Sequence, residues 1–256
     1  MAKKFFVKRT EISKDGFRYR GLETSRLENL TDAIFGFAIT LLVISSQVPN
    51  TYIELQASMY SFIGFIFCII LLLGIWDNHH NFYLHYGLQD RKTKILNFLF
   101  LFVLLFYVYP LKYLFSFLGT SIYAKIKLSF GDDSEALQLV LNELRNASLN
   151  VSQWADLTIR FGLGLFLIYT FLFAMHLHAF KKRKELELSP RETYITKTFI
   201  QAYAILMCIA VLSMLIVVFF GGKYASISGF TYLLVPFAIP FHRKYRTNKM
   251  RKLFDT

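Results

Sequence analysis

The stretch that decides the fold is residues 26–47, which read Arg-Leu-Glu-Asn-Leu-Thr-Asp-Ala-Ile-Phe-Gly-Phe-Ala-Ile-Thr-Leu-Leu-Val-Ile-Ser-Ser-Gln. From residue 33 to residue 46 every side chain is apolar or small, as in a helix that lies in lipid. The stretch nevertheless carries Asp32 where the apolar run begins and Thr40 near its middle. A charge or a hydroxyl in hydrocarbon costs free energy unless it has a partner, so such side chains usually face protein or water.

Helical periodicity divides this stretch into two faces. At about 100° per residue, one narrow stripe collects a mostly apolar set with a single hydroxyl: Arg26, Leu30, Ala33, Phe37, Thr40 and Ile44. Asp32 projects from a different side and indicates a polar anchor. The pattern favours a helix that lines an ion pathway.

The composition indicates an integral membrane protein. Of the 256 residues 55% are hydrophobic, and only 18% are charged, against roughly 25% in soluble domains. The net charge of +12 does not indicate nucleic-acid binding, because the basic residues cluster beside the ends of apolar runs, where they meet anionic lipid. Cys68 and Cys208 lie inside apolar runs, which indicates buried free thiols.

Six segments are long and apolar enough to span a bilayer, since a span needs about 20 residues. They are residues 30–48, 56–79, 94–119, 155–180, 197–220 and 225–242. The sequence therefore predicts an all-α protein with one six-helix membrane domain over residues 1–256. Its parts are an N-terminal segment (1–25), a membrane region (26–242) with an outer loop (121–154), and a basic tail (243–256).

The basic residues also predict an orientation. Of the 29 Lys and Arg residues, 23 lie in the segments 3–26, 91–94, 181–197 and 243–252, which fall on one side of a six-span protein. Basic residues accumulate on the cytoplasmic side. We therefore expect a multi-pass protein of the cell membrane with both termini in the cytoplasm.

Finer features are predicted within and beside the spans. In the outer loop, Asp133 or Ser134 can cap a short amphipathic helix that lies on the outer rim. Its apolar residues recur at helical spacing: Leu137, Val140, Leu141 and Leu144. Pro110 is expected to kink the third span, and Pro236 and Pro240 to make the sixth irregular near its end.

Two motifs resemble those of a known family. Arg26-Leu-Glu-Asn-Leu30-Thr31-Asp32 is similar to the opening of the first helix in the transmembrane protein 175 family of potassium channels, with Leu30 and Thr31 where that family usually has Phe and Ser. Gly74-Ile-Trp76-Asp-Asn78-His79-His80-Asn-Phe82 resembles the tryptophan–histidine–histidine–phenylalanine pattern at the cytoplasmic end of that family's second helix.

The resemblance implies a potassium-selective channel that conducts passively. It implies one six-helix repeat per chain and a homotetramer whose central pore is lined by four copies of the first helix. The family's pore positions correspond to Phe37, Thr40 and Ile44, the stripe found from periodicity. The family more often has Leu or Ile where this chain has Phe37. Potassium is the permeant ion, and no cofactor is implied.

Each predicted pore residue could instead have a purely structural role. Rings of Phe37 and Ile44 would form a dry constriction that gates by dewetting, but both can instead pack between helices. A ring of Thr40 hydroxyls would replace part of the hydration of potassium, or each hydroxyl can bond back to the carbonyl of Gly36.

Asp32 is expected to be buried and to join the first helix to the second. Its candidate partners are Arg26, Trp76, Asn78 and His79. A carboxylate beside a histidine also permits a proton relay. Arg26 is difficult to reconcile with cation flow, because ideal helical geometry places it on the pore stripe, where a ring of positive charges would oppose cations. Either the helix begins irregularly there, or Arg26 folds back to Asp32.

Two other functions compete with the channel. A proton-coupled or other secondary transporter would need inverted repeats or ionisable residues at mid-membrane, and neither is visible. A non-conducting membrane scaffold would only pack the polar motifs. An enzyme is not expected, because no catalytic or metal-binding set of residues is present. The expected partners are further copies of the chain, membrane lipids and potassium, with no nucleic acid.

Overall fold

The computed structural model describes residues 11–13, 15–44 and 49–255 and is helical throughout this part, apart from loops and one isolated β-bridge between Ile12 and Arg18. The elements in chain order are α1 (Arg26–Ile44), α2 (Tyr52–Met59), α3 (Phe62–Tyr86), α4 (Arg91–Ser129), α5 (Glu135–Asn146), α6 (Val151–Lys181), α7 (Pro190–Phe220), η1 (Gly222–Tyr224), α8 (Ala225–Phe230), η2 (Thr231–Leu234) and α9 (Val235–Phe254).

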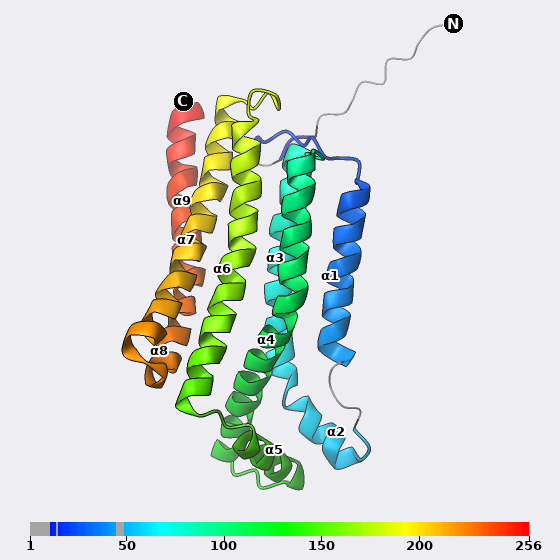
Figure 1. Cartoon of the computed structure of the whole chain (residues 1–256), viewed down its shortest axis with the longest axis vertical. Helices are drawn as coiled ribbons and strands as arrows, with labels where there is room; N and C mark the ends of the chain where they lie inside the picture. Colours follow the sequence, from blue (N-terminus) through cyan, green and yellow to red (C-terminus); the bar gives the residue numbers. More distant parts are fainter. Residues whose placement is uncertain (1–10, 14, 45–48, 256) are drawn as a thin grey trace, which may run out of the picture.

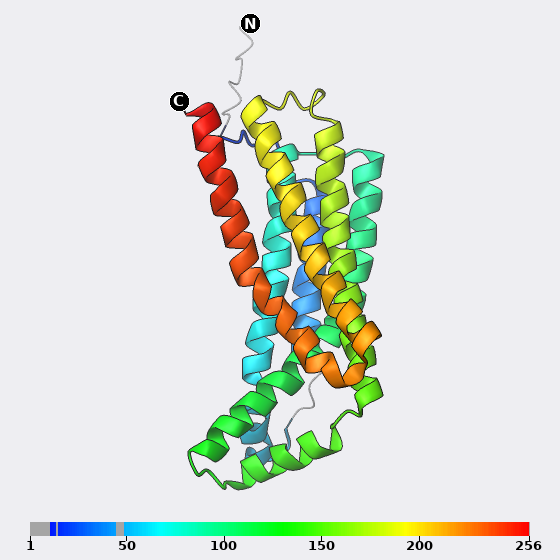
Figure 2. The same cartoon turned by 90° about the vertical axis from the view of Figure 1, so that its left-hand side faces the viewer.

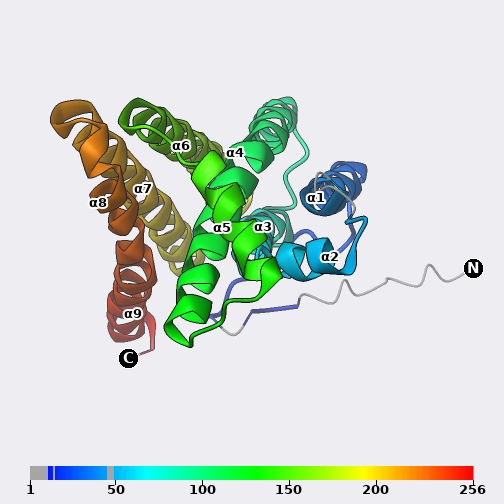
Figure 3. The ribbon, with the colours of Figure 1, turned by 90° about the horizontal axis from the view of Figure 1, so that it is seen from below.

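The long helices stand side by side in one bundle (Figure 1). Residues 15–25, the α6–α7 connection and the end of α9 lie at one end of the bundle, which we call the terminal end. Helices α2 and α5 lie at the opposite end, which we call the distal end. Seen along its length, the bundle has α1 at one edge and α8 and α9 at the other (Figure 3). Helix α1 packs mainly on α3 and α4 among the described long helices, and its opposite face is exposed.

Five helical stretches of the described chain are long and apolar enough to cross a membrane, and the protein is therefore a multi-pass membrane protein. They are α3, α4, α6, α7 and the stretch Gly222–Phe254. These correspond to the second to sixth predicted spans. Helix α1 corresponds to the first, but it is not among the five. Four residues of the first predicted span, 45–48, lie outside the described residues.

Helix α4 is longer than the predicted third span and continues past its predicted end. It has 39 residues, and at 1.5 Å per residue it extends about 58 Å, far more than a hydrocarbon core of about 30 Å. Pro110 does not break it. The first part of the predicted outer loop, up to Ser129, is therefore helix.

The predicted amphipathic helix of the outer loop is confirmed as α5. Ser134, rather than Asp133, caps it by accepting a hydrogen bond from the backbone of Leu137. Its apolar face packs on α2 and on the end of α4 in a small core of Tyr60, Ala124, Leu137 and Val140. Figure 2 shows this distal layer projecting below the long helices.

The last span is interrupted by an irregular segment, but this segment does not lie at Pro236 and Pro240, where the sequence analysis expected it. The irregular part is η1, α8 and η2, which follows Gly221 at φ +84°. Pro236 lies in the first turn of α9, where a missing N–H costs nothing, and α9 continues through Pro240 to Phe254. The basic tail therefore continues the last helix.

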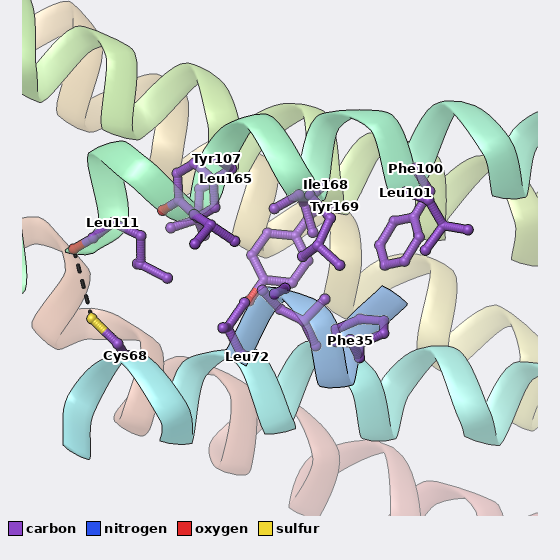
Figure 4. Close-up of a cluster of buried hydrophobic side chains, with 14 of the residues drawn as sticks. Phe35, Cys68, Leu72, Phe100, Leu101, Tyr107, Leu111, Leu165, Ile168 and Tyr169 are labelled. Atoms are coloured by element: carbon purple, nitrogen blue, oxygen red, sulfur yellow. Dashed lines mark hydrogen bonds between the residues drawn. The ribbon is translucent and has the colours of Figure 1, made fainter. Parts of the chain in front are cut away.

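The largest core joins α1, α3, α4 and α6 (Figure 4). It contains Phe35 of α1, Leu72 of α3, Phe100 of α4 and Ile168 of α6, all buried. Cys68 lies in this core as a free thiol whose Sγ donates to the carbonyl of Leu111 at 3.7 Å. Cys208 is also free but exposed, so the prediction that it is buried was wrong.

Helices α3 and α4 touch through their backbones near the distal end of the bundle. A Cβ added to Gly64 would collide with the carbonyl of Phe115, and one added to Gly119 would collide with the backbone of Gly64. Small residues at such crossings let membrane helices approach closely. This contact fixes the spacing of α3 and α4, the two helices on which α1 packs.

Candidate functional site

Helix α1 presents two different faces. The buried face packs on α3 and α4 and consists of Leu27, Glu28, Thr31, Phe35, Ala38 and Leu42. The exposed face carries the predicted stripe: Arg26, Leu30, Ala33, Phe37 and Thr40 are all exposed. Phe37 is 58% exposed. Ile44 ends α1, and its side chain lies outside the described part of the chain.

A phenylalanine this exposed in the middle of a long apolar helix has no packing role within the protomer. Gly36 beside it is equally open, since a Cβ added there would meet nothing within 4 Å. The face must therefore meet lipid, another copy of the chain or a water-filled space between copies. The alternative that Phe37 packs between helices does not hold within one chain.

Thr40 makes the hydrogen bond to its own helix that the sequence analysis gave as an alternative. Its Oγ1 donates to the carbonyl of Gly36 at 2.8 Å. A hydroxyl that donates in this way keeps its lone pairs, which point away from the helix backbone. The hydroxyl oxygen can still accept hydrogen bonds or contact a cation on the exposed face.

Asp32 is tied to α3 by one hydrogen bond. Trp76 Nε1 donates to Asp32 Oδ1 at 2.8 Å, and the indole is stacked on the His80 ring with centroids 5.3 Å apart. Trp76 was one of four candidate partners. The prediction that Asp32 is buried was wrong for the protomer, in which Asp32 is exposed.

The other three candidates do not bond to Asp32. Arg26 begins α1 and stays on the exposed face, with no bond to Asp32 in the described chain, so it does not fold back. Asn78 donates to the carbonyl of Gly74 at 2.6 Å and accepts from the Tyr203 hydroxyl at 3.2 Å, which ties α3 to α7. His79 points into the protein, as described next.

A buried polar chain lies behind the exposed face of α1. The Thr31 hydroxyl donates to Leu27 O and therefore accepts from Asn97 Nδ2 at 3.1 Å. Asn97 Oδ1 then remains as an acceptor, so His79 Nε2 donates to it. All three side chains are buried. This chain links α1, α4 and α3 through Thr31, Asn97 and His79, and buried polar groups need such complete pairing.

Asn97 was missed by the sequence analysis. The signal was present, since an amide within the apolar run from Ile95 to Leu101 is costly in a membrane helix unless it is paired. Only the fold shows that its partners lie on two other helices.

The segment before α1 is anchored at the terminal end by Glu192, whose side chain is 1% exposed. Arg20 Nη1 and Nη2 contact the two carboxylate oxygens at 3.0 Å each, and Arg18 Nη2 contacts Oε2 at 3.2 Å. The hydrogen bond to Glu192, together with its charge, raises the pKa of Arg18. Glu192 also completes a capping box with Ser189 at the start of α7. The start of α1 is thereby fixed relative to α7.

Asp90 makes a second polar junction at the terminal end, before α4. It accepts from the Thr93 hydroxyl at 2.6 Å and lies 2.9 Å from His178 Nε2. Partial burial raises the pKa of Asp90, but the hydrogen bonds from Thr93 and His178 and the nearby positive charge outweigh it, so the pKa lies below its ordinary value. Within the described residues, no group of three or more His, Cys, Asp or Glu side chains is placed to hold a metal ion.

Comparison with known proteins now identifies the family. Residues 26–107 match the family described as "Endosomal/lysosomal potassium channel TMEM175". A potassium channel of Marivirga tractuosa is 39% identical over 243 residues, which cover 93% of this chain and 94% of that protein. The chain belongs to the TMEM175 family of potassium channels. Its members are not enzymes.

Two further potassium channels extend the comparison. The potassium channel Cha6605_3372 of Chamaesiphon minutus is 29% identical over 173 residues, 57% of this chain and 82% of that protein. A crystal structure of a variant of the potassium channel MtTMEM175, in complex with a Nanobody-MBP fusion protein, aligns with a TM-score of 0.76 at 35% identity. That alignment covers 92% of this chain and 99% of the other. The match to residues 26–107 contains Asp32, Trp76, His79 and Asn97.

Proposed function

We propose that four copies of this chain assemble around their α1 helices into a potassium-selective channel, through which ions move passively down their electrochemical gradient. One observation carries the proposal: the exposed face of α1 is the same stripe that periodicity assigns to the pore, and it lies opposite the face that packs on α3 and α4. The assembly would have both termini in the cytoplasm and would lie in the cell membrane, as the basic residues favour.

Phe37, Thr40 and Ile44 are the proposed pore residues. Phe37 is the most exposed large apolar side chain among the described side chains of α1. Four such rings around an axis would leave an opening too narrow and too dry for a hydrated ion, which makes a hydrophobic gate. Thr40, one turn further along, would offer four hydroxyl oxygens to a partly dehydrated cation, because its own proton is donated to Gly36 O.

The polar contacts behind α1 would hold this face on the axis. The bond from Trp76 to Asp32 and the chain from Thr31 through Asn97 to His79 connect α1 to both supporting helices. A structural role for Asp32 is favoured over a proton relay, since His79 bonds to Asn97 instead of Asp32.

Ion flux through purified protein in liposomes tests the function. Vesicles loaded with potassium and diluted into a sodium or choline medium should develop an inside-negative potential without any coupling ion. A pH dependence with obligatory proton exchange would instead indicate a transporter, and vesicles no leakier than empty ones would indicate a scaffold. Particle mass in lipid nanodiscs tests the tetramer, and a mass other than that of four chains contradicts it.

A further inference from the structure

A groove lies between α7 and α9. These two helices stand on the side of the protomer away from α1 (Figure 3). It has a volume of about 390 Å³, within the range of sites for small organic ligands. Its walls come from α7 and α9, and it reaches inward to Asn78 of α3 and Tyr169 of α6.

The two ends of the groove differ in chemistry. Toward the middle of the bundle the walls are apolar and include Leu206, Val235, Pro236 and Ile239. At the terminal end they are basic, with His242, Arg243 and Arg246. Along α9 the distance from Pro236 to Arg246 is about 15 Å, which is half the thickness of a hydrocarbon core. The step from apolar to basic walls therefore matches the step from the core of a bilayer leaflet to its headgroups.

The basic end has unused donors for an anion. Arg246 is held by its stack on the Tyr194 ring at 3.8 Å and by bonds from Nε to Thr198 Oγ1 at 3.0 Å and from Nη2 to Tyr194 O at 3.4 Å. A guanidinium has five N–H donors, so others remain for an anion. Arg243 is exposed. His242 Nε2 contacts Gln201, whereas its Nδ1 is buried with no hydrogen-bond partner in the described chain.

One carboxylate, Asp15, also lines the groove. Because two arginines and one aspartate line it, the terminal end of the groove carries a net positive charge. Arginine is suited to phosphate because its planar fork can donate two parallel hydrogen bonds.

We propose that this groove binds one anionic glycerophospholipid from the leaflet on the side of the chain termini. The phosphate lies against Arg243 and Arg246, and one acyl chain lies along Leu206, Pro236 and Ile239. The acyl chain gains little free energy by leaving bulk lipid, which is equally apolar. The apolar wall therefore shapes the site, and the arginines supply the preference for a negative headgroup. This inference does not depend on what the protein conducts.

Lipid retention measured by native mass spectrometry tests the proposal on the purified protein. The protein is loaded in detergent with phosphatidylglycerol or with phosphatidylcholine of the same acyl chains, and bound lipid is counted after detergent exchange. We expect phosphatidylglycerol to be retained several-fold more than phosphatidylcholine. Equal retention of the two lipids would overturn the proposal without any variant.

Two variants separate the groove from the general surface charge. Arg243→Gln should reduce phosphatidylglycerol retention several-fold, whereas Lys249→Gln, the same change of charge on α9 but outside the groove, should leave it unchanged. Ala202→Phe fills the apolar part while every charge remains, so it should also reduce retention. An unchanged thermal midpoint shows that each variant is folded, and Ala202→Leu is the milder replacement if it is not.

The same variants exclude other occupants. Wild-type retention after Ala202→Phe, or equal losses in Arg243→Gln and Lys249→Gln, would mean that lipid binds only to the charged surface. Inorganic phosphate at millimolar concentration should compete weakly, because it uses only the headgroup contacts. Full displacement of the lipid by phosphate would reassign the groove to a free anion.

Discussion

The indole nitrogen of Trp76 on α3 lies 2.8 Å from Oδ1 of Asp32 on α1 and donates a hydrogen bond to it. Asp32 is the last charged residue of α1 before the run from Ala33 to Ile44, which carries no charge. This bond therefore fixes the rotation of α1 about its own axis at the end where the exposed face begins. The proposed pore depends on that rotation.

Trp76→Phe tests the bond, because it keeps the aromatic ring and removes the donor. A hydrogen bond to a charged acceptor is worth about 1.5–3 kcal/mol, and the exposure of Asp32 in the protomer favours the lower value. The variant should lower the unfolding free energy by about 1–2 kcal/mol. Trp154→Phe, whose ring packs on Phe117, is the matched control. Additive effects of Trp76→Phe and Asp32→Asn in a double-mutant cycle would show that the two residues are not coupled.

Asn97→Ala should destabilise the protein because it removes the link between Thr31 and His79. Loss of a buried polar group that serves two partners costs about 1–3 kcal/mol. Asn81→Ala is the control, since that half-buried amide bonds, within the described chain, only to the Asp77 carbonyl of its own helix. Unfolding by denaturant measures both variants. If they lost equal stability, the buried chain would have no special role.

Phe37→Ala should widen the proposed constriction and raise the single-channel conductance. Phe241→Ala is a matched control, because Phe241 is 75% exposed on α9, at the opposite edge of the protomer. Planar-bilayer recordings compare the two variants with the wild type. A conductance unchanged by Phe37→Ala would move the narrowest ring elsewhere.

Thr40→Ala should lower the permeability ratio of potassium to sodium several-fold while assembly stays intact. The hydroxyl oxygen is the only polar side-chain atom on this part of the stripe, so its loss leaves the pore without a ligand for a dehydrated ion. Thr170→Ala is the control, since Thr170 makes the same bond to the carbonyl four residues before it, on α6. Reversal potentials measure the ratio. A ratio equal to that of the wild type would remove Thr40 from selectivity.

Sequence periodicity was enough to predict which face of α1 is open, because a helix repeats every 3.6 residues and the apolar pattern there is regular. It also predicted α5 with its cap. It did not predict the length of α4, since residues 121–129 include two lysines and are only moderately apolar, and only Ala124 among them is buried. The break in the last span was assigned to Pro236 and Pro240, but a proline in a first turn does not disturb a helix, and α9 continues through Pro240.

The parts of the site that the sequence did not predict are contacts between segments far apart in the chain. Glu192 is separated from Arg18 by 174 residues, and His79 is separated from Asn97 by 18. No local pattern pairs such residues. A polar side chain in an apolar run indicates that a partner exists, and only the packing of α1, α3, α4 and α7 shows which residue it is.

A density map of the assembled particle in a lipid nanodisc tests the central claim most directly. The account predicts a fourfold axis surrounded by four α1 helices, with Phe37 and Thr40 directed at that axis. A map in which Thr40 faces lipid, or in which the chain stands alone without a central passage, would contradict it.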